Sequence, residues 1–267
     1  MRSLHAYLAI LLLSVTVISC QKEPDESILN PPSSNCQLVR AEALDDTGAI
    51  DDTAGYVYTS DKVTRTNFSD YYNTFEYTGS KVSKRNYFEN GSSSMVAYDG
   101  VTYNGDGTIN KIQTFFSSPA LPAGVLIFSY EFTYSAGKLT KLIEKADTTF
   151  TGATPVPIYE YDYTYTGSNI TRVISNDLDL AVKDTTDFTY DTKANYYAKN
   201  PAALFTDLLF NPFDGQILPI FLSANNAIKL KSAGDEYVLA YNVDDKSNLK
   251  EFVVDGQVLI RYTYKCN

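Results

Sequence analysis

The sequence predicts a mainly β protein, an antiparallel meander of β-hairpin repeats that forms a curved open sheet or a loosely closed barrel. One short helical insertion is expected near residues 200–211. Two observations predict this fold. An aromatic–polar–tyrosine unit recurs along the chain, and each copy leads through turn-forming residues into a return segment that begins with an aliphatic residue. The 267 residues also include 22 tyrosines and 14 phenylalanines, a side-chain class that favours pleated sheets.

The first 19 residues have the pattern of a bacterial lipoprotein signal peptide. Arg2 supplies a positive charge, residues 8–18 form an apolar run too short for a typical spanning helix, and Cys20 closes the small-residue segment. Cys20 is therefore predicted to become the lipidated first residue of the mature protein. An ordinary secretory signal with a chance cysteine is the alternative interpretation.

Residues 20–35 are predicted to be a lipidated tether. Residues 21–26 are polar, and the proline- and serine-rich segment after them favours an extended chain. No other segment of the sequence approaches spanning length, so membrane contact is predicted through the lipid anchor only. The lysine and acids after Cys20 resemble the signal of surface-exposed Bacteroidota lipoproteins. That resemblance implies an outer-membrane location with exposure at the cell surface.

Residues 36–267 are predicted to form a single β-rich repeat domain. Copies of the repeat cover residues 56–65, 75–84, 101–112, 132–142, 163–173 and 239–250, with partial copies at 188–191 and 262–264. The period-two alternation in each copy places both aromatic rings on one face of a strand. Glycine, asparagine, serine and aspartate then favour a tight turn. Each copy is therefore interpreted as a β-hairpin, and neighbouring copies as a meander.

Aliphatic residues three apart follow several of these turns and do not fit a flat strand. The pairs are Ile109 and Ile112, Leu139 and Leu142, and Ile170 and Val173. On a regular strand this spacing puts the two side chains on opposite faces. The first residue could cap the hairpin end as part of the turn, both faces could be partly buried, or a bulge could shift the phase. We favour the first explanation.

The tyrosine units loosely resemble the tyrosine–aspartate repeats of Rhs-type bacterial surface proteins over most of residues 55–265, with Tyr190-Asp191 as the unit that carries the aspartate. The chain more closely resembles uncharacterised Bacteroidota outer-membrane lipoproteins with tyrosine-rich hairpins and an inserted helical segment. This resemblance implies a fold and a location, and it implies no molecular activity.

An insertion over residues 196–232 interrupts the repeats. Asn200 is a predicted helix N-cap and Pro201 suits the first helical position, after which Leu204 and Leu208 contribute to an apolar face. A second apolar run covers residues 217–222. We expect the insertion to pack against one end or one face of the sheet. A lid or a binding patch is the functional alternative.

Cys36 and Cys266 remain once Cys20 is lipidated. The exported compartment permits disulfides, so a Cys36–Cys266 bridge between the two ends of the domain is predicted. Two free buried thiols are the alternative.

The composition excludes several classes of chemistry. His5, which lies in the predicted signal peptide, is the only histidine, so histidine-dependent nucleophiles and histidine-ligated zinc are excluded in the mature chain. No catalytic, cofactor-binding or metal-ligating residue is predicted, and no cofactor. Carboxylate-based glycoside hydrolysis remains open because acids are abundant. The net charge of −10 argues against a nucleic-acid partner.

Three short motifs resemble the O-glycosylation signal of Bacteroidota, and they predict modification at Thr53, Thr148 and Thr185. Chance occurrence is the alternative for each. Taken together, the sequence predicts a non-catalytic cell-envelope lipoprotein that acts as a surface binding or interaction module, with a glycan or a protein as partner. A carboxylate-dependent glycan-active enzyme or accessory subunit, and a purely structural envelope protein, are the alternatives.

Overall fold

The computed structural model describes residues 36–118, 121–147, 149, 151–197, 203–206 and 214–266. The predicted signal peptide, Cys20 and the tether lie outside the described residues. So do Thr148 and the predicted helix start at Asn200 and Pro201.

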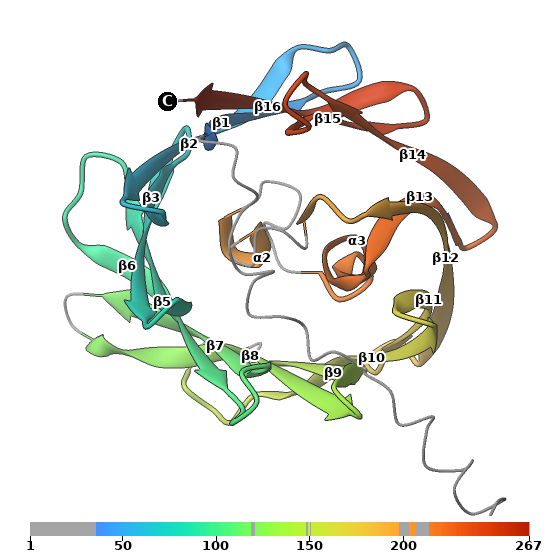
Figure 1. Cartoon of the computed structure of the whole chain (residues 1–267). Helices are drawn as coiled ribbons and strands as arrows, with labels where there is room; N and C mark the ends of the chain where they lie inside the picture. Colours follow the sequence, from blue (N-terminus) through green and yellow to red (C-terminus); the bar gives the residue numbers. More distant parts are fainter. Residues whose placement is uncertain are drawn as a thin grey trace, which may run out of the picture.

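Sixteen strands in the described residues form a closed antiparallel barrel (Figure 1). The strands are β1 (Cys36–Leu44), β2 (Ile50–Thr59), β3 (Lys62–Asn67), β4 (Tyr71–Thr78), β5 (Lys81–Glu89), β6 (Met95–Tyr103), β7 (Ile109–Ser118), β8 (Leu121–Ser135), β9 (Lys138–Ala146), β10 (Val156–Thr166), β11 (Asn169–Asp177), β12 (Val182–Ala194), β13 (Asn225–Ser232), β14 (Asp235–Val243), β15 (Leu249–Val254) and β16 (Gln257–Cys266). Each strand pairs with its neighbours in sequence, and β1 pairs with β16. The predicted meander is therefore confirmed, and of the two shapes that the sequence allows the chain adopts the barrel.

A β-bulge in each hairpin explains the aliphatic residues three apart. Tyr165 pairs with Ile170, and Thr164 pairs with Arg172. Thr171 is therefore an extra, unpaired residue in the return strand. Ile170 and Val173 consequently both face the interior and are completely buried. The same extra residue occurs at Thr64, Ser83, Asn110, Thr140, Lys250 and Leu259. The favoured explanation, a residue that caps the turn, was wrong: the first aliphatic side chain belongs to the core.

The repeated tyrosines tie each hairpin to the one before it. The Tyr77 hydroxyl donates to the Val63 carbonyl at 2.8 Å, and the Tyr103 hydroxyl donates to the Val82 carbonyl at 2.7 Å. In both cases the acceptor is the aliphatic residue that begins the return strand of the previous hairpin. Lysines at the start of return strands cover the next tyrosine ring, with Lys62, Lys81 and Lys138 lying 5.0, 5.1 and 5.2 Å from the rings of Tyr77, Tyr103 and Tyr165. We call these hydroxyl–carbonyl contacts the tyrosine ladder.

A disulfide closes the barrel at the seam between β1 and β16. Cys36 and Cys266 are direct cross-strand partners and are bonded to each other across a sequence separation of 230 residues. This is the pairing predicted from the sequence. Since β1 and β16 are the first and last strands, the bond fixes the ring of strands where the two ends of the meander meet.

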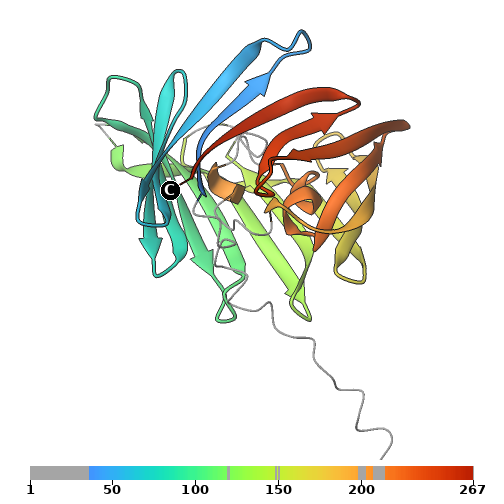
Figure 2. The same cartoon turned by 45° about the horizontal axis from the view of Figure 1, so that its top comes forward.

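The insertion between β12 and β13 lies inside the barrel. Its described residues form two short helices, α2 (Ala203–Thr206) and α3 (Leu218–Leu222), and both views show them surrounded by strands (Figures 1 and 2). Their buried side chains join the core formed by inward-facing strand residues. The predicted boundary at residue 232 was wrong, because Asn225–Ser232 form β13, where alternating inward residues such as Leu230 favour a strand. The described part of the predicted helix, residues 203–206, is helical as expected, and α3 is a second helix in the second apolar run.

Side chains of the barrel wall hold the insertion by its backbone carbonyls. The Tyr56 hydroxyl donates to the Thr206 carbonyl at 2.9 Å, and the Arg85 guanidinium donates to the Phe205 carbonyl at 3.0 Å. Both carbonyls belong to the last described residues of α2. Arg85 also forms a buried ion pair with Asp99 at 2.6 Å. The Tyr163 hydroxyl donates to the Gly215 carbonyl at 2.9 Å, so the wall holds the insertion at several points.

Candidate functional site

The outer surface of the barrel carries rows of charged side chains. Glu131 on β8 lies between Lys111 on β7 and Lys145 on β9, at 3.0 and 2.8 Å. Further cross-strand ion pairs join Lys141 to Glu160, Arg172 to Asp187, and Lys229 to Glu236. Their strand neighbours, such as Ile112 and Leu142, are buried in the core, so by alternation the charges face outward. A barrel that spans a membrane has the opposite polarity, with an apolar outer band.

The wall opens between β13 and β14. The two strands, both described in full, pair only from Lys229 to Ser232 and from Asp235 to Val238. Beyond that point β13 stays with β12, where Tyr190 pairs with Ala227, and β14 stays with β15. The first four residues of β13 and the last five of β14 therefore diverge. On the other side of β13, β12 carries an irregularity, because residues 191–193 have no paired partner between Tyr190 and Ala194.

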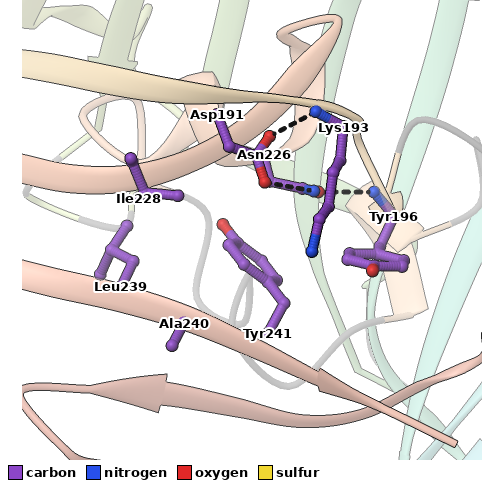
Figure 3. A pocket seen from close by; sticks show the side chains of 8 residues that line it. All are labelled: Asp191, Lys193, Tyr196, Asn226, Ile228, Leu239, Ala240 and Tyr241. Carbon is purple, nitrogen blue, oxygen red and sulfur yellow. Dashed lines mark hydrogen bonds between the residues drawn. The ribbon is translucent and has the colours of Figure 1, made fainter.

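A crevice with a volume of about 240 Å³ occupies this opening (Figure 3). Its polar lining consists of Asp191, Lys193 and Asn226, its aromatic lining of Tyr196 and Tyr241, and its apolar lining of Ile228, Leu239 and Ala240. We call it the wall crevice. Pockets for drug-sized ligands usually enclose about 300–1,000 Å³, so the wall crevice has room for one small group.

Hydrogen bonds position the polar groups of the wall crevice. The Asn226 side chain is fully buried, accepts from the Tyr196 backbone N–H at 3.0 Å and donates to Asp191 at 3.3 Å. The second Asp191 oxygen accepts from the Lys193 backbone N–H at 2.9 Å. A carboxylate offers about four acceptor positions, so Asp191 retains capacity for a ligand. Figure 3 shows the Lys193 side chain extending across the crevice toward the two aromatic rings.

The Tyr241 side chain contributes a polar group to the lining of the wall crevice. Its oxygen is buried and makes no hydrogen bond within the described residues. Burial raises the pKa of Tyr241, and the nearby Tyr190 and Asp191 raise it further, so the phenol keeps its proton. The Tyr241 ring also lies 5.7 Å from the Tyr196 ring. An unsatisfied buried hydroxyl costs about 1–3 kcal/mol, so this group lowers the stability of the fold where it stands.

A second group of acids lies in the barrel interior. Burial, and secondarily the charge of Asp214, raises the pKa of Glu144 to about 7, although the hydroxyls of Tyr130 and Tyr161 hydrogen-bond to its carboxylate. Burial also raises the pKa of Asp214, which lies on the insertion. The fold thus brings together two acids 70 residues apart that no local motif connects. A carboxyl group with a pKa near 7 can act as a proton donor at neutral pH.

Two of the predicted modification sites lie on outward-facing strand positions. Thr53 is on β2 opposite Glu42, and Thr185 is exposed on β12. Both backbone N–H groups donate to the side chain of the preceding aspartate, at 2.7 Å. Among the described residues no cluster of His, Cys, Asp or Glu could hold a metal ion. None of the described helices is long and apolar enough to cross a membrane.

The wall crevice was missed at the level of sequence. Its residues come from β12, β13, β14 and the segment between β12 and β13, and their proximity depends on a strand register that no local motif records. One signal was present: the copy at residues 239–250 has Val243, in place of tyrosine, opposite the aliphatic Leu249. That substitution marks the point where the ladder is interrupted.

Comparison with known proteins agrees with the fold. A solved porin-like protein from Bacteroides uniformis has 12% sequence identity to this chain and a TM-score of 0.52, over 87% of this chain and 98% of that one. This is similarity of fold alone. No family model and no curated protein matches the chain.

Proposed function

We propose that this protein is a non-catalytic lipoprotein of the bacterial cell envelope that acts as a binding or interaction module. Lipid at Cys20 anchors it to the outer membrane, and the barrel itself stands in water at the cell surface. The observation that carries this proposal is the row of outward-facing ion pairs, of which Lys111–Glu131–Lys145 is the clearest. Charged side chains on the lipid-facing surface of a barrel cost about 2–4 kcal/mol each at the bilayer midplane.

The interior of the barrel supports binding over transport. Wall donors such as Tyr56 and Arg85 hold α2 inside the ring of strands, and α3 packs into the same core. The wall crevice then supplies a recessed surface that combines aromatic and polar side chains, which is the composition typical of ligand sites. The proposed role is therefore recognition at the wall crevice by a barrel tethered through residues 20–35.

Lipid labelling and membrane extraction of the C20A variant test this proposal. The wild-type chain should incorporate a fatty-acid probe and fractionate with membranes, whereas C20A should lose the label and become extractable by alkaline carbonate. Ser33→Ala, a small change within the predicted tether, serves as the matched control and should behave as wild type. Retention of unlabelled C20A in carbonate-washed membranes would show that the barrel itself is embedded and would overturn the proposal.

A carboxylate-dependent glycan-active enzyme is the second candidate. The specific observation in its favour is Glu144, a half-buried acid with a pKa raised to about 7 beside Asp214. Glycoside hydrolysis uses two carboxyl groups with separated pKa values. Turnover of a polysaccharide panel that disappears in both E144Q and D214N would establish this function in place of the first. Absence of turnover by the wild-type protein would eliminate it.

A further inference from the structure

We propose that the wall crevice is a strand-acceptor site, where an extended segment of a partner polypeptide adds to the sheet by pairing with the open edge of β14. This inference rests on the proposed function, since it names the kind of partner that the same site binds. Recognition of the partner comes from main-chain groups of the barrel wall, and the side chains of the lining have a secondary part.

Part of β14 has no strand partner on the side that faces the crevice. β13 and β14 pair over the four residue pairs nearest their turn, and the pairing stops after Val238 although both strands continue. From Leu239 to Val243, β14 pairs with β15 alone among the described residues. We call this unpaired side of residues 239–243 the open edge.

The direction of the main-chain groups follows from contacts on the β15 side. The Val238 N–H donates to the Asp255 carboxylate at 2.7 Å, and the Val238 carbonyl accepts from the Asp255 N–H at 2.8 Å. The Asp244 N–H donates to the Asn248 carbonyl at 3.0 Å. Main-chain groups alternate in direction along an antiparallel strand, so those of even-numbered residues here point away from the crevice. The groups that point into the crevice belong to Leu239, Tyr241 and Val243.

An edge of this kind selects an extended polypeptide. It presents one N–H and one C=O at every second residue, a repeat of about 6.8 Å. A second extended chain presents matching acceptors and donors at the same repeat, which a sugar ring or a lipid does not. Addition of a strand to an open sheet edge is a known mode of peptide recognition, in which main-chain hydrogen bonds supply affinity. The five residues of the open edge cover about 17 Å, the length of an average strand.

The sequence of β14 suits the addition of a strand. Residues 237–243 contain no charged residue and no proline, and four of the seven are valine or tyrosine, which favour strands. Proteins usually protect an open edge with a charge or a proline. Here the charge comes from the neighbouring wall, because the exposed Lys193 side chain on β12 extends across the crevice (Figure 3). A partner strand therefore has to displace one flexible side chain.

The wall crevice also gives the added strand a place for a side chain. Its volume of about 240 Å³ lies between Leu239 and Tyr241 on β14 and Ile228 on β13. Strand-acceptor sites commonly use pockets for alternate side chains of the bound segment to supply specificity. The crevice has this position, directly beside the open edge, and accepts one side chain of the partner.

Selection of peptides on the full chain in detergent tests the proposal. The probe is a phage-displayed library of random heptapeptides, and peptides that bind are then synthesised with the amide N–H groups of alternate residues methylated. A strand bonded to β14 uses the N–H groups of one alternating set. Methylation of that set should weaken binding at least tenfold, which corresponds to about 1.4 kcal/mol, and methylation of the other set should leave the affinity unchanged.

A proline on the protein side gives a second test. Val243→Pro removes an N–H that points into the crevice and should weaken the selected peptides about tenfold. Asp245→Pro is the matched control, because it places proline in the adjacent turn outside the crevice lining. Asp245 follows the first residue of a turn that the Ser247 N–H closes on the Asp244 carbonyl at 3.1 Å, a position that proline favours. Its affinity and unfolding temperature should equal those of wild type.

Several outcomes would overturn the proposal. These are a library that yields no binder, equal effects of the two methylation sets, and equal affinities of V243P and D245P. Dimerisation of the wild-type chain that V243P abolishes would assign the open edge to a second copy instead. Protection of the Tyr241 amide from hydrogen exchange in the monomeric, peptide-free chain would show that the chain itself already occupies the edge.

The tests are independent of one another and of the proposed function. The methylation result uses the wild-type chain, so it stands even where V243P fails to fold. None of the results depends on C20A fractionation, so the lipid-anchored function can stand when the strand-acceptor assignment falls, and the reverse.

Discussion

The repeating hairpins from β2 to β11 and the irregular sector from β12 to β14 both carry tyrosines on their strands. The tyrosine hydroxyls make different contacts in the two regions. In the repeating part, the tyrosine hydroxyls of the ladder end on carbonyls of the preceding hairpin, as Tyr103 does on Val82. In the irregular sector Val243 occupies the ladder position, β13 leaves β14, and Tyr241 keeps a buried hydroxyl without a partner. Buried polar atoms without a partner occur in both regions, on Thr66, Asn73, Asn86 and Ser129 as well as on Tyr241, so what separates the regions is the tyrosine ladder and the strand pairing.

The irregular sector also depends on the repeating wall for its support. A bulge such as the one at Thr171 lets a return strand bury two aliphatic side chains. The hairpins of the regular wall are therefore stabilised by residues that lie close together in the sequence. The insertion that departs from β12 takes its anchors from that wall, through Tyr163 and Arg85. The crevice then lies where the insertion leaves and returns, beside its first residues, including Tyr196.

Breaking the Cys36–Cys266 disulfide is expected to cause the largest loss of stability, since this bond closes the barrel that contains both regions. Cys36→Ser, Cys266→Ser or reduction of the wild-type protein should lower the free energy of unfolding by about 5–6 kcal/mol in the chain-entropy model, since the bond closes a loop of 230 residues. Urea denaturation with and without reductant measures the loss. The double variant should lose no more than either single variant, and an additive loss would contradict a role through the shared bond.

Gly215→Ala should weaken the packing of the insertion against the barrel wall. A Cβ atom at Gly215 would lie 2.6 Å from the Tyr161 ring, closer than any real contact allows, so the ring or the insertion must shift. Overpacking of this kind costs about 1–3 kcal/mol. Gly100→Ala, on the outer wall with open space around the new Cβ, is the matched control and should leave the unfolding temperature close to wild type. Equal behaviour of the two variants would mean that the insertion contributes nothing to stability.

The contact between wall and insertion should also depend on pH. Glu144 has a pKa raised from 4.5 to about 7, so the folded state binds more protons than the unfolded state in that range. Stability must then fall as pH rises through this window. Glu144→Gln removes this proton linkage. After allowance for partial exposure, its stability relative to wild type should increase by about 1–2 kcal/mol between pH 5 and pH 8. A constant difference, measured by urea denaturation across this range, would refute the linkage.

Local patterns of the sequence predict the repeating part and fail at the irregular sector for a physical reason. Alternation and turn residues specify hairpins, and counting cysteines specifies the bond between Cys36 and Cys266. In the sequence, the bulges are visible only as interruptions of the two-residue alternation. Several backbone geometries explain such an interruption equally well. The crevice depends on register: Tyr241 sits in a unit that looks like the other copies, but Leu249 pairs with Val243, two residues beyond it. That offset exists only once the strands are aligned.

The smallest expected effect addresses the comparison most directly. Tyr103→Phe deletes a hydroxyl that donates to the Val82 carbonyl at 2.7 Å, and loss of such a bond costs about 0.5–1.5 kcal/mol. Tyr241→Phe deletes a hydroxyl with no partner and should cost nothing, or stabilise the protein slightly, because an unsatisfied buried group is removed. Thermal unfolding of the two variants side by side measures the difference. Equal losses would mean that Tyr241 is bonded within the protein, and the two regions would then differ in geometry alone.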